Sequence, residues 1–395
     1  MSKPTMRRWF PGVAAIALLA SACGSGSSSG STSDGDIVIG ASMALSGQIN
    51  LQQIRDGYQM RVDEVNAAGG IKIDGKKRKL VLKVLDNRTD SNTMTQQVRT
   101  LALKDGAVAL LGSCCQQNIE MQAQADALKT PLVEVALPVE LLPKGEGYAW
   151  DSFQALADGA KGFYELAAGQ QTDKKVLIVT NNDAPGTGTA DLWTQVGKAA
   201  GFDIAVTKAV PAGTTDFSDV VSAGKSAGAD ILIAAMVPPD CFAMWKQMKA
   251  LQYAPKMAIG LQCAQTPGWG SLGTLGDGTL VQTNWTTTSG LPEADKIIKA
   301  YGEKYPNVND LGSVAAGYHA ASIIIAAIEA AGSTDKAAIN KAIGELDISS
   351  ALGPVKFTDN KSTTPTFLGQ WKDGNIEQVW PAQGAVALQP LSGLQ

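Results

Sequence analysis

After residue 36 the chain alternates short apolar runs with segments whose apolar residues recur at helical spacing. In the first block, the runs that predict strands are at 36–42, 80–85, 107–111 and 131–135. The pattern restarts after residue 151, and there the predicted strands are at 175–180, 203–208, 231–235, 257–259 and 279–283. Strand–helix–strand repetition favours parallel sheets covered by helices, so the sequence predicts an α/β fold with two doubly wound lobes.

The last hundred residues follow a different pattern. They predict helices at 292–305, 311–331 and 337–346. Short strands with antiparallel character follow, at 355–357, 367–371 and 377–380. A mixed segment after two α/β blocks allows the chain to cross between the lobes more than once.

The first residues have the features of an export signal. Lys3, Arg7 and Arg8 precede an apolar segment at 13–20 that is too short to span a bilayer. The small residues that follow, and then Cys23, resemble a bacterial lipoprotein signal, which predicts a signal peptide at 1–22 and lipid on Cys23. The Gly/Ser-rich composition of residues 23–36 predicts a flexible linker after this cysteine. A plain secretory signal is the alternative.

Composition excludes several classes of protein. The formal net charge of −4 gives no electrostatic footprint for nucleic acid. After the signal, no uninterrupted apolar run reaches the roughly 18 residues of a membrane-spanning helix. The single histidine, His319, lies in an apolar helical pattern, where it is usually structural. We therefore expect no enzyme, no cofactor and no metal site.

The most promising loop follows the predicted strand at 107–111. Gly112 and Ser113 end that strand, and Cys114, Cys115 and three amide side chains (Gln116, Gln117 and Asn118) precede a helix predicted from about residue 119. In open α/β sheets, small ligands bind at such strand-to-helix turns, because free N–H groups of the helix point there.

Several landmarks together resemble the Leu/Ile/Val-binding family of ABC-importer receptors. They are the segment at 39–47, Gly57, the Asn-Ala-Ala-Gly-Gly-Ile segment that ends at Ile71, and the later segments at 216–218 and 352–357. The resemblance implies a periplasmic-binding fold of type I, in which two lobes joined by three hinge crossovers close on a ligand. It places the crossovers near 150–154, 283–285 and 353–357.

These crossovers divide the chain into lobes. We expect the N-terminal lobe to comprise 37–152 plus 285–353, and the C-terminal lobe to comprise 153–284 plus 354–395. The function implied is an extracytoplasmic, lipid-anchored solute receptor that delivers its ligand to an ABC-transporter permease. The alternative is a ligand-sensing receptor that acts through a separate signalling partner.

The resemblance also suggests ligand-binding positions. Where amino-acid-binding members hold the ligand carboxylate with hydroxyl residues, this chain has Gln116 and Leu137. Where they hold the ammonium group with an acid, it has Gln262. The full set of candidate ligand-binding residues is Gln116, Gln117, Val135, Leu137, Asp183, Pro238, Gln262 and Trp285.

These departures predict a ligand other than a free amino acid. A buried ammonium without an acid costs several kcal/mol, whereas amides offer donors and acceptors without charge. An amide-like or aromatic solute would suit the glutamines and a wall from Trp285 or Trp269. The alternative is that Asp183 or Asp240 takes the ammonium group from another direction.

Four cysteines remain besides Cys23, and they allow three pairings. Cys241 and Cys263 follow successive predicted strands, so their loops can meet, and this is the pairing we favour. A Cys114–Cys115 bridge within the pocket is the alternative.

Overall fold

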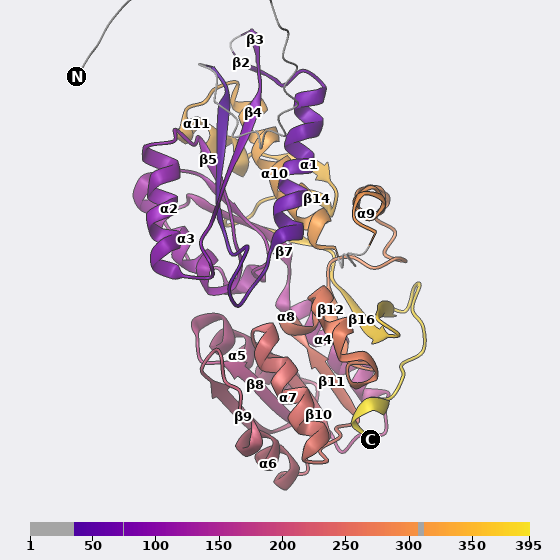
Figure 1. Ribbon diagram of the computed structural model, residues 1–395. Coiled ribbons are helices and arrows are strands. Elements are labelled where there is room, and N and C mark those ends of the chain that lie inside the picture. Colours follow the sequence, from indigo (N-terminus) through magenta and orange to yellow (C-terminus); the bar gives the residue numbers. More distant parts are fainter. Residues whose placement is uncertain (1–34, 74, 307–311) are drawn as a thin grey trace, which may run out of the picture.

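The computed structural model describes residues 35–73, 75–306 and 312–395, which form two α/β lobes (Figure 1). The predicted signal peptide and Cys23 lie outside the described residues. Each lobe has a central sheet between two layers of helices. The predicted fold class, two doubly wound α/β lobes, is confirmed.

The first lobe is built on a six-stranded parallel sheet with the order β15-β7-β6-β5-β1-β4. Its strands are β1 (Ile37–Met43), β4 (Leu80–Asp86), β5 (Ala109–Leu111), β6 (Leu132–Glu134), β7 (Ala149–Gln154) and β15 (Lys361–Thr364). The core on one face packs against α1 (Gln52–Ala67), α10 (Ser313–Ala331) and α11 (Lys336–Gly344). The other face packs against α2 (Ser91–Leu103) and α3 (Cys115–Leu128).

The second lobe has a seven-stranded sheet with the order β17-β16-β12-β11-β10-β8-β9. Its parallel strands are β8 (Lys175–Asn181), β9 (Asp203–Val210), β10 (Ile231–Ala235), β11 (Met257–Gly260) and β12 (Leu280–Thr283). The antiparallel strands β16 (Phe367–Lys372) and β17 (Asn375–Trp380) complete it. Helices α4 (Leu156–Ala168) and α5 (Ala184–Ala199) cover one face, and α6 (Ser218–Ser226) and α7 (Pro238–Ala250) cover the other.

The remaining elements are short or peripheral. They are the hairpins β2–β3 (Ile71–Ile73, Lys76–Arg78) and β13–β14 (Asp347–Ser350, Gly353–Lys356), the helices α8 (Leu261–Ala264) and α9 (Pro292–Lys304), and the 3-10 segments η1 (Val139–Leu141), η2 (Pro267–Leu275) and η3 (Ser392–Leu394).

Helices α1 and α10 cross closely because each has a glycine at the contact. A Cβ atom on Gly57 would lie 2.1 Å from the carbonyl oxygen of Val314, and one on Gly317 would lie 2.1 Å from that of Ile54. The two backbones therefore touch where no larger residue fits. Among the described residues, α10 is the one helix long and apolar enough to span a membrane, but 78% of its apolar window is buried inside the protein.

The third crossover lies later in the chain than the sequence predicted. We expected it at 353–357, but strand β15 pairs in parallel with β7 of the first sheet, and only β16 joins the second. Residues 361–364 thus belong to the first lobe rather than to the second. The backbone hydrogen bonds between β15 and β7 decide this, and a short polar strand carries no sign of its partner in its sequence.

Candidate functional site

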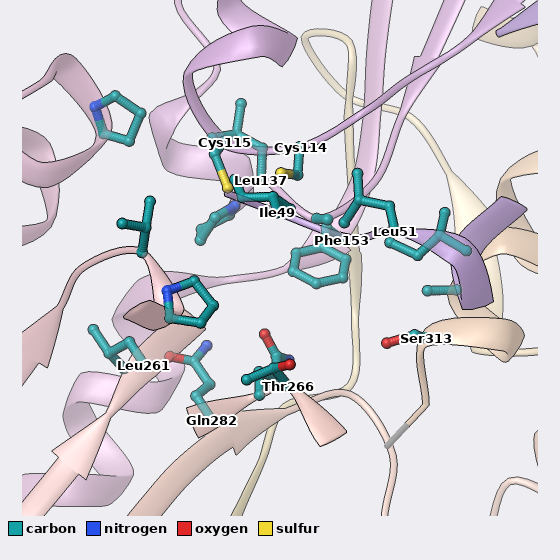
Figure 2. A pocket seen from close by; sticks show the side chains of 18 of the residues that line it. Ile49, Leu51, Cys114, Cys115, Leu137, Phe153, Leu261, Thr266, Gln282 and Ser313 are labelled. Atoms are coloured by element: carbon teal, nitrogen blue, oxygen red, sulfur yellow. The ribbon is translucent and has the colours of Figure 1, made fainter. Parts of the chain in front are cut away.

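A cavity of about 340 Å³ lies between the lobes, at the ends of strands from both sheets. The first lobe contributes Ile49, Leu51, Cys114, Leu137 and Phe153, and these face Leu261, Thr266 and Gln282 of the second lobe (Figure 2). Most of the lining is apolar, and its polar side chains are amides, hydroxyls and two thiols. No described residue in the lining carries a charge, so the cavity suits a small, mainly apolar molecule.

The structure brings only part of the predicted site to this cavity. Leu137 and Pro238 line it. The described lining does not include Gln116, Gln117, Val135, Asp183 or Trp285. The side chain of Gln262 lies outside the described residues.

Gln117 has an internal role instead. Its amide oxygen accepts hydrogen bonds from Ser113 Oγ at 2.9 Å and Asn87 Nδ2 at 3.2 Å, and its Nε2 donates to Asn87 Oδ1. Asn118 likewise joins Ser113 N to the carbonyl oxygen of Val135. These amides fix the turn after β5 rather than facing a ligand.

Helix α3 begins four residues earlier than we predicted, at Cys115 instead of Ile119. The difference decides which side chains face the cavity, since it places Gln116 and Gln117 in the first helical turn. Gln116 points along the helix, where its Nε2 lies 3.4 Å from Glu120 Oε1. The first turn of α3 has few apolar residues, so no apolar periodicity signals its start.

The two acids that could have held an ammonium group have other partners. Asp183 caps α5, because its carboxylate accepts a hydrogen bond of 2.8 Å from Gly186 N. Asp240 is 1% exposed, and it accepts hydrogen bonds from Asn181 Nδ2 and Gly213 N at 2.9 and 3.0 Å. Burial raises the pKa of Asp240. Neither acid lines the cavity.

The aromatic wall also differs from the prediction. The Trp285 indole donates to Asp295 at 2.8 Å, and Trp269 packs edge-to-face on Trp245 inside the second lobe. Phe153 of the first lobe and Phe242 of the second line the cavity instead. Phe153 is the second-last residue of the crossover strand β7, and we had assigned this position to the hinge rather than to the site.

Two adjacent thiols form part of the upper wall in Figure 2. Cys114 and Cys115 both line the cavity and are not in a disulfide. The hydrogen bond to Cys115 and burial raise the pKa of the Cys114 thiol. The backbone is strained here: Cys115 and Ala136 have φ of 56° and 62°, and Cys115 N donates to the carbonyl oxygen of Ala136 at 3.3 Å.

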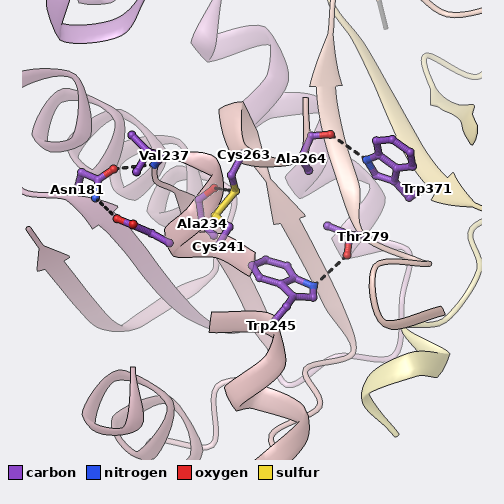
Figure 3. Close-up of a disulfide and its surroundings, with 10 residues drawn as sticks. Asn181, Ala234, Val237, Cys241, Trp245, Cys263, Ala264, Thr279 and Trp371 are labelled. Carbon is purple, nitrogen blue, oxygen red and sulfur yellow. Dashed lines mark hydrogen bonds between the residues drawn. A yellow bond between two sulfur atoms is a disulfide. The ribbon is translucent and has the colours of Figure 1, made fainter. Parts of the chain in front are cut away.

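The other cysteine pair lies inside the second lobe. The structure joins Cys241 of α7 to Cys263 of α8, with Cα atoms 6.1 Å apart (Figure 3). This is the pairing that the sequence favoured. Nearby, the Trp245 and Trp371 indoles donate to Thr279 Oγ1 and the carbonyl oxygen of Ala264, so the surroundings of the disulfide are rigidly packed.

Two lobes, three crossovers and a ligand-sized cavity between them define a binding protein that encloses a small molecule. The chain belongs to the periplasmic binding protein family, whose model matches residues 36–375. This family and fold are those of solute-binding proteins rather than enzymes.

Known relatives cover nearly the whole chain. It is 28% identical over 382 residues to the Leu/Ile/Val-binding protein homolog 8 of Brucella abortus, covering 89% of this chain and 92% of the relative. The solved structure of the branched-chain amino acid transporter substrate binding protein LivJ of Streptococcus pneumoniae, in complex with isoleucine, superposes with a TM-score of 0.77 at 20% identity and covers 87% of this chain and 98% of that one. An ABC-transporter solute binding protein from R. palustris, in complex with benzoate, gives 0.76 at 18% identity and covers 89% and 98%.

Proposed function

We propose that this protein is the extracytoplasmic, lipid-anchored solute receptor of an ABC importer, and that its ligand is an aromatic or amide-like solute rather than a free amino acid. The uncharged lining of the cavity carries the proposal. An amino-acid ammonium group buried there would meet no acid among the described lining residues, at a cost of several kcal/mol. An apolar or aromatic body would instead meet Phe153, Phe242 and the aliphatic side chains.

The two ligand-bound neighbours are the reason for inferring the ligand class from the side chains that line the cavity rather than from the fold. One is in complex with isoleucine and the other with benzoate, yet both superpose similarly on this chain. The type I fold therefore does not decide the ligand, and side chains at the cavity must.

Calorimetric titration of the purified protein with leucine, isoleucine, benzoate and benzamide tests the ligand class. We expect at least one aromatic compound to bind and to raise the melting temperature, with neither amino acid binding tightly. Small-angle scattering with the bound compound should show a smaller radius of gyration, because ligand contacts to both lobes favour the closed state. Tight leucine binding would reject the proposed ligand class.

Anchoring is tested separately. A Cys23→Ser variant lacks the thiol that would receive lipid, so it should move from the membrane fraction to the soluble fraction. Intact-mass measurement of the wild-type protein should show a lipid adduct on Cys23. A wild-type protein that fractionates as soluble, with no adduct, would contradict the anchor and favour a plain secretory signal.

A further inference from the structure

A strongly basic hairpin lies on the surface of the first lobe. Strands β2 and β3 form it, and five of the eight residues at 72–79 are basic: Lys72, Lys76, Lys77, Arg78 and Lys79. With Asp74 counted, this stretch carries a charge of +4 in a chain whose formal net charge is −4. The four lysines are exposed and the arginine is half-buried. Positive charge is therefore concentrated at one place on an acidic protein.

The hairpin is anchored on the lobe through one face and presents charge on the other. Ile71 and Ile73 of β2 are 1% and 2% exposed, and they pack in the core around α1 and α10. Lys72, between them, faces solvent and lies directly opposite Lys77 of β3. Two like charges in directly opposed positions repel each other and weaken a hairpin. An anionic surface over this face would offset that repulsion.

Backbone contacts orient part of this basic cluster. Lys79 Nζ donates a hydrogen bond to the carbonyl oxygen of Asn66, and the Arg78 guanidinium donates to that of Gly35. A backbone carbonyl is uncharged, so these contacts hold the side chains in place without cancelling their charge. The cluster can therefore still attract an anion.

The hairpin lies where the chain enters the fold. Strand β4 follows β3 directly and pairs in parallel with β1, so Leu80 lies opposite Ile37. Ile37 N donates to the carbonyl oxygen of Lys79 at 2.8 Å. The amino ends of these strands and the hairpin thus share the end of the first lobe that is farthest from the second lobe (Figure 1). The cavity lies at the opposite end, where the carboxyl ends of the strands are.

A lipid on Cys23 would keep this end of the molecule close to a bilayer. Only about 12 residues separate Cys23 from Gly35, the first described residue. A random coil of that length and Gly/Ser-rich composition has a root-mean-square span of about 20 Å. The part of the protein that the proposed anchor brings to the headgroups is therefore the part with the most concentrated positive charge.

We propose that the β2–β3 hairpin is a docking surface for a membrane of anionic phospholipid, and that it orients the receptor with the first lobe at the bilayer and the second lobe outermost. The inference rests on the proposed lipid anchor, which delivers the hairpin to the membrane. Each lysine or arginine close to an anionic bilayer strengthens binding about 5-fold. The rest of the chain has a net negative charge, so an anionic bilayer disfavours other orientations.

Vesicle sedimentation tests this surface without the lipid anchor. The probe is the chain 23–395 with Cys23→Ser, which contains every described residue and cannot be acylated. In low salt it should bind vesicles of phosphatidylcholine with phosphatidylglycerol at least about 10-fold more tightly than vesicles of phosphatidylcholine alone. Raising the salt to about 0.5 M should remove most of this preference, because salt screens exposed charges.

A pair of double variants locates the interaction. Lys72→Gln/Lys76→Gln should weaken binding to the anionic vesicles about 20-fold, at roughly 5-fold for each lysine. Lys198→Gln/Lys208→Gln is the matched control, because both lysines are exposed, lie on α5 and β9 of the second lobe, and give the same change in net charge. It should leave the binding unchanged. Melting temperatures of the variants check that each one folds.

The outcomes separate the docking surface from the anchor. Equal binding to the two kinds of vesicle, or equal losses in the two double variants, rejects the docking surface, while a lipid adduct on Cys23 of the wild-type protein still supports the anchor. If that adduct is absent but the probe binds anionic vesicles through Lys72 and Lys76, the anchor is rejected and the hairpin stands as the membrane attachment.

Discussion

His319 shows how the position of a residue decides its role. The chain has a single histidine, and it lies fully buried in α10, outside the cavity lining. Its Nε2 hydrogen-bonds to Ser152 Oγ at 2.8 Å, which fixes α10 to β7. Burial lowers the pKa of His319 to about 3, so the imidazole stays neutral in the folded protein.

This lowered pKa predicts a loss of stability in mild acid. Below pH 6.5 His319 is protonated in the unfolded chain but stays neutral in the folded protein. The free energy of unfolding therefore falls as the pH drops from 6.5 towards 3. At pH 5 this one residue should lower the free energy of unfolding by about 2 kcal/mol. Urea unfolding of wild type and His319→Gln at pH 7.5 and pH 5 measures it as a difference between the two curves. Parallel curves would contradict the assignment.

The two cavity thiols predict a specific reaction. Since Cys114 and Cys115 are adjacent and in contact, phenylarsine oxide should bridge them and add one arsenical per molecule in intact-mass spectra. In a Cys23→Ser background, Cys115→Ser should abolish the stable adduct, because a single thiol holds the reagent weakly. An adduct that persists in the double variant Cys114→Ser/Cys115→Ser would mean that another site reacts.

At the scale of elements, the N-terminus of α4 in the second lobe is capped by a residue of the first lobe. The residue before it, Ala155, has no capping side chain, and the Glu140 carboxylate of η1 accepts hydrogen bonds from Leu156 N and Ala157 N at 2.7 and 2.9 Å. A carboxylate at a helix N-terminus also interacts favourably with the helix dipole. Glu140 thus fixes the direction in which the chain enters the second lobe.

Removing this cap should destabilise the folded protein measurably. Glu140→Ala is expected to lower the free energy of unfolding by about 1 kcal/mol, and Glu140→Gln by less, since the amide oxygen still accepts. Urea denaturation measures both. Glu303→Ala, in an exposed position of α9, is the matched control and should change stability little. Equal effects of Glu140→Ala and Glu303→Ala would exclude the capping role.

For the whole molecule, the cores of the two lobes are separate, and the disulfide belongs to one of them. The first lobe's core forms around α1 and α10, whereas Cys241 and Cys263 lie in the core between α7 and the second sheet. The disulfide closes a loop with a sequence separation of 22. It therefore restricts the unfolded second lobe and leaves the first unconstrained.

Breaking this bond should destabilise the second lobe. Cys241→Ser/Cys263→Ser is expected to lose about 3 kcal/mol, as loop-closure entropy predicts for a loop of this length. Scanning calorimetry with and without dithiothreitol measures the effect. The reductant should lower the melting temperature of wild type and leave the double variant unchanged. An unchanged wild type would mean that the bond contributes no stability.

The architecture could be predicted because its signals are local. Apolar runs of strand length separated by helical periodicity identify a buried parallel sheet wherever they occur, and their restart after residue 151 separates the two lobes. The pairing of Cys241 with Cys263 could be predicted for a related reason. Both follow successive parallel strands, β10 and β11, which lie side by side in the sheet.

The cavity could not be predicted to the same extent. Which side chains line it depends on where helices begin and on how two lobes face each other, and neither leaves a local pattern. An earlier start of α3 placed Gln117 in an internal network and Cys115 at the cavity. Gln154 and Phe153 looked like hinge residues until the end of β7 was seen to reach the cavity.

By itself, then, the sequence determined two α/β lobes and their order along the chain, because hydrophobic periodicity is a short-range signal, and it favoured the Cys241–Cys263 disulfide because the two cysteines follow successive strands. Only the tertiary structure decided the place of the third crossover and the uncharged lining of the cavity. Those depend on hydrogen bonds and contacts between segments far apart in the chain, which no local stretch of sequence encodes.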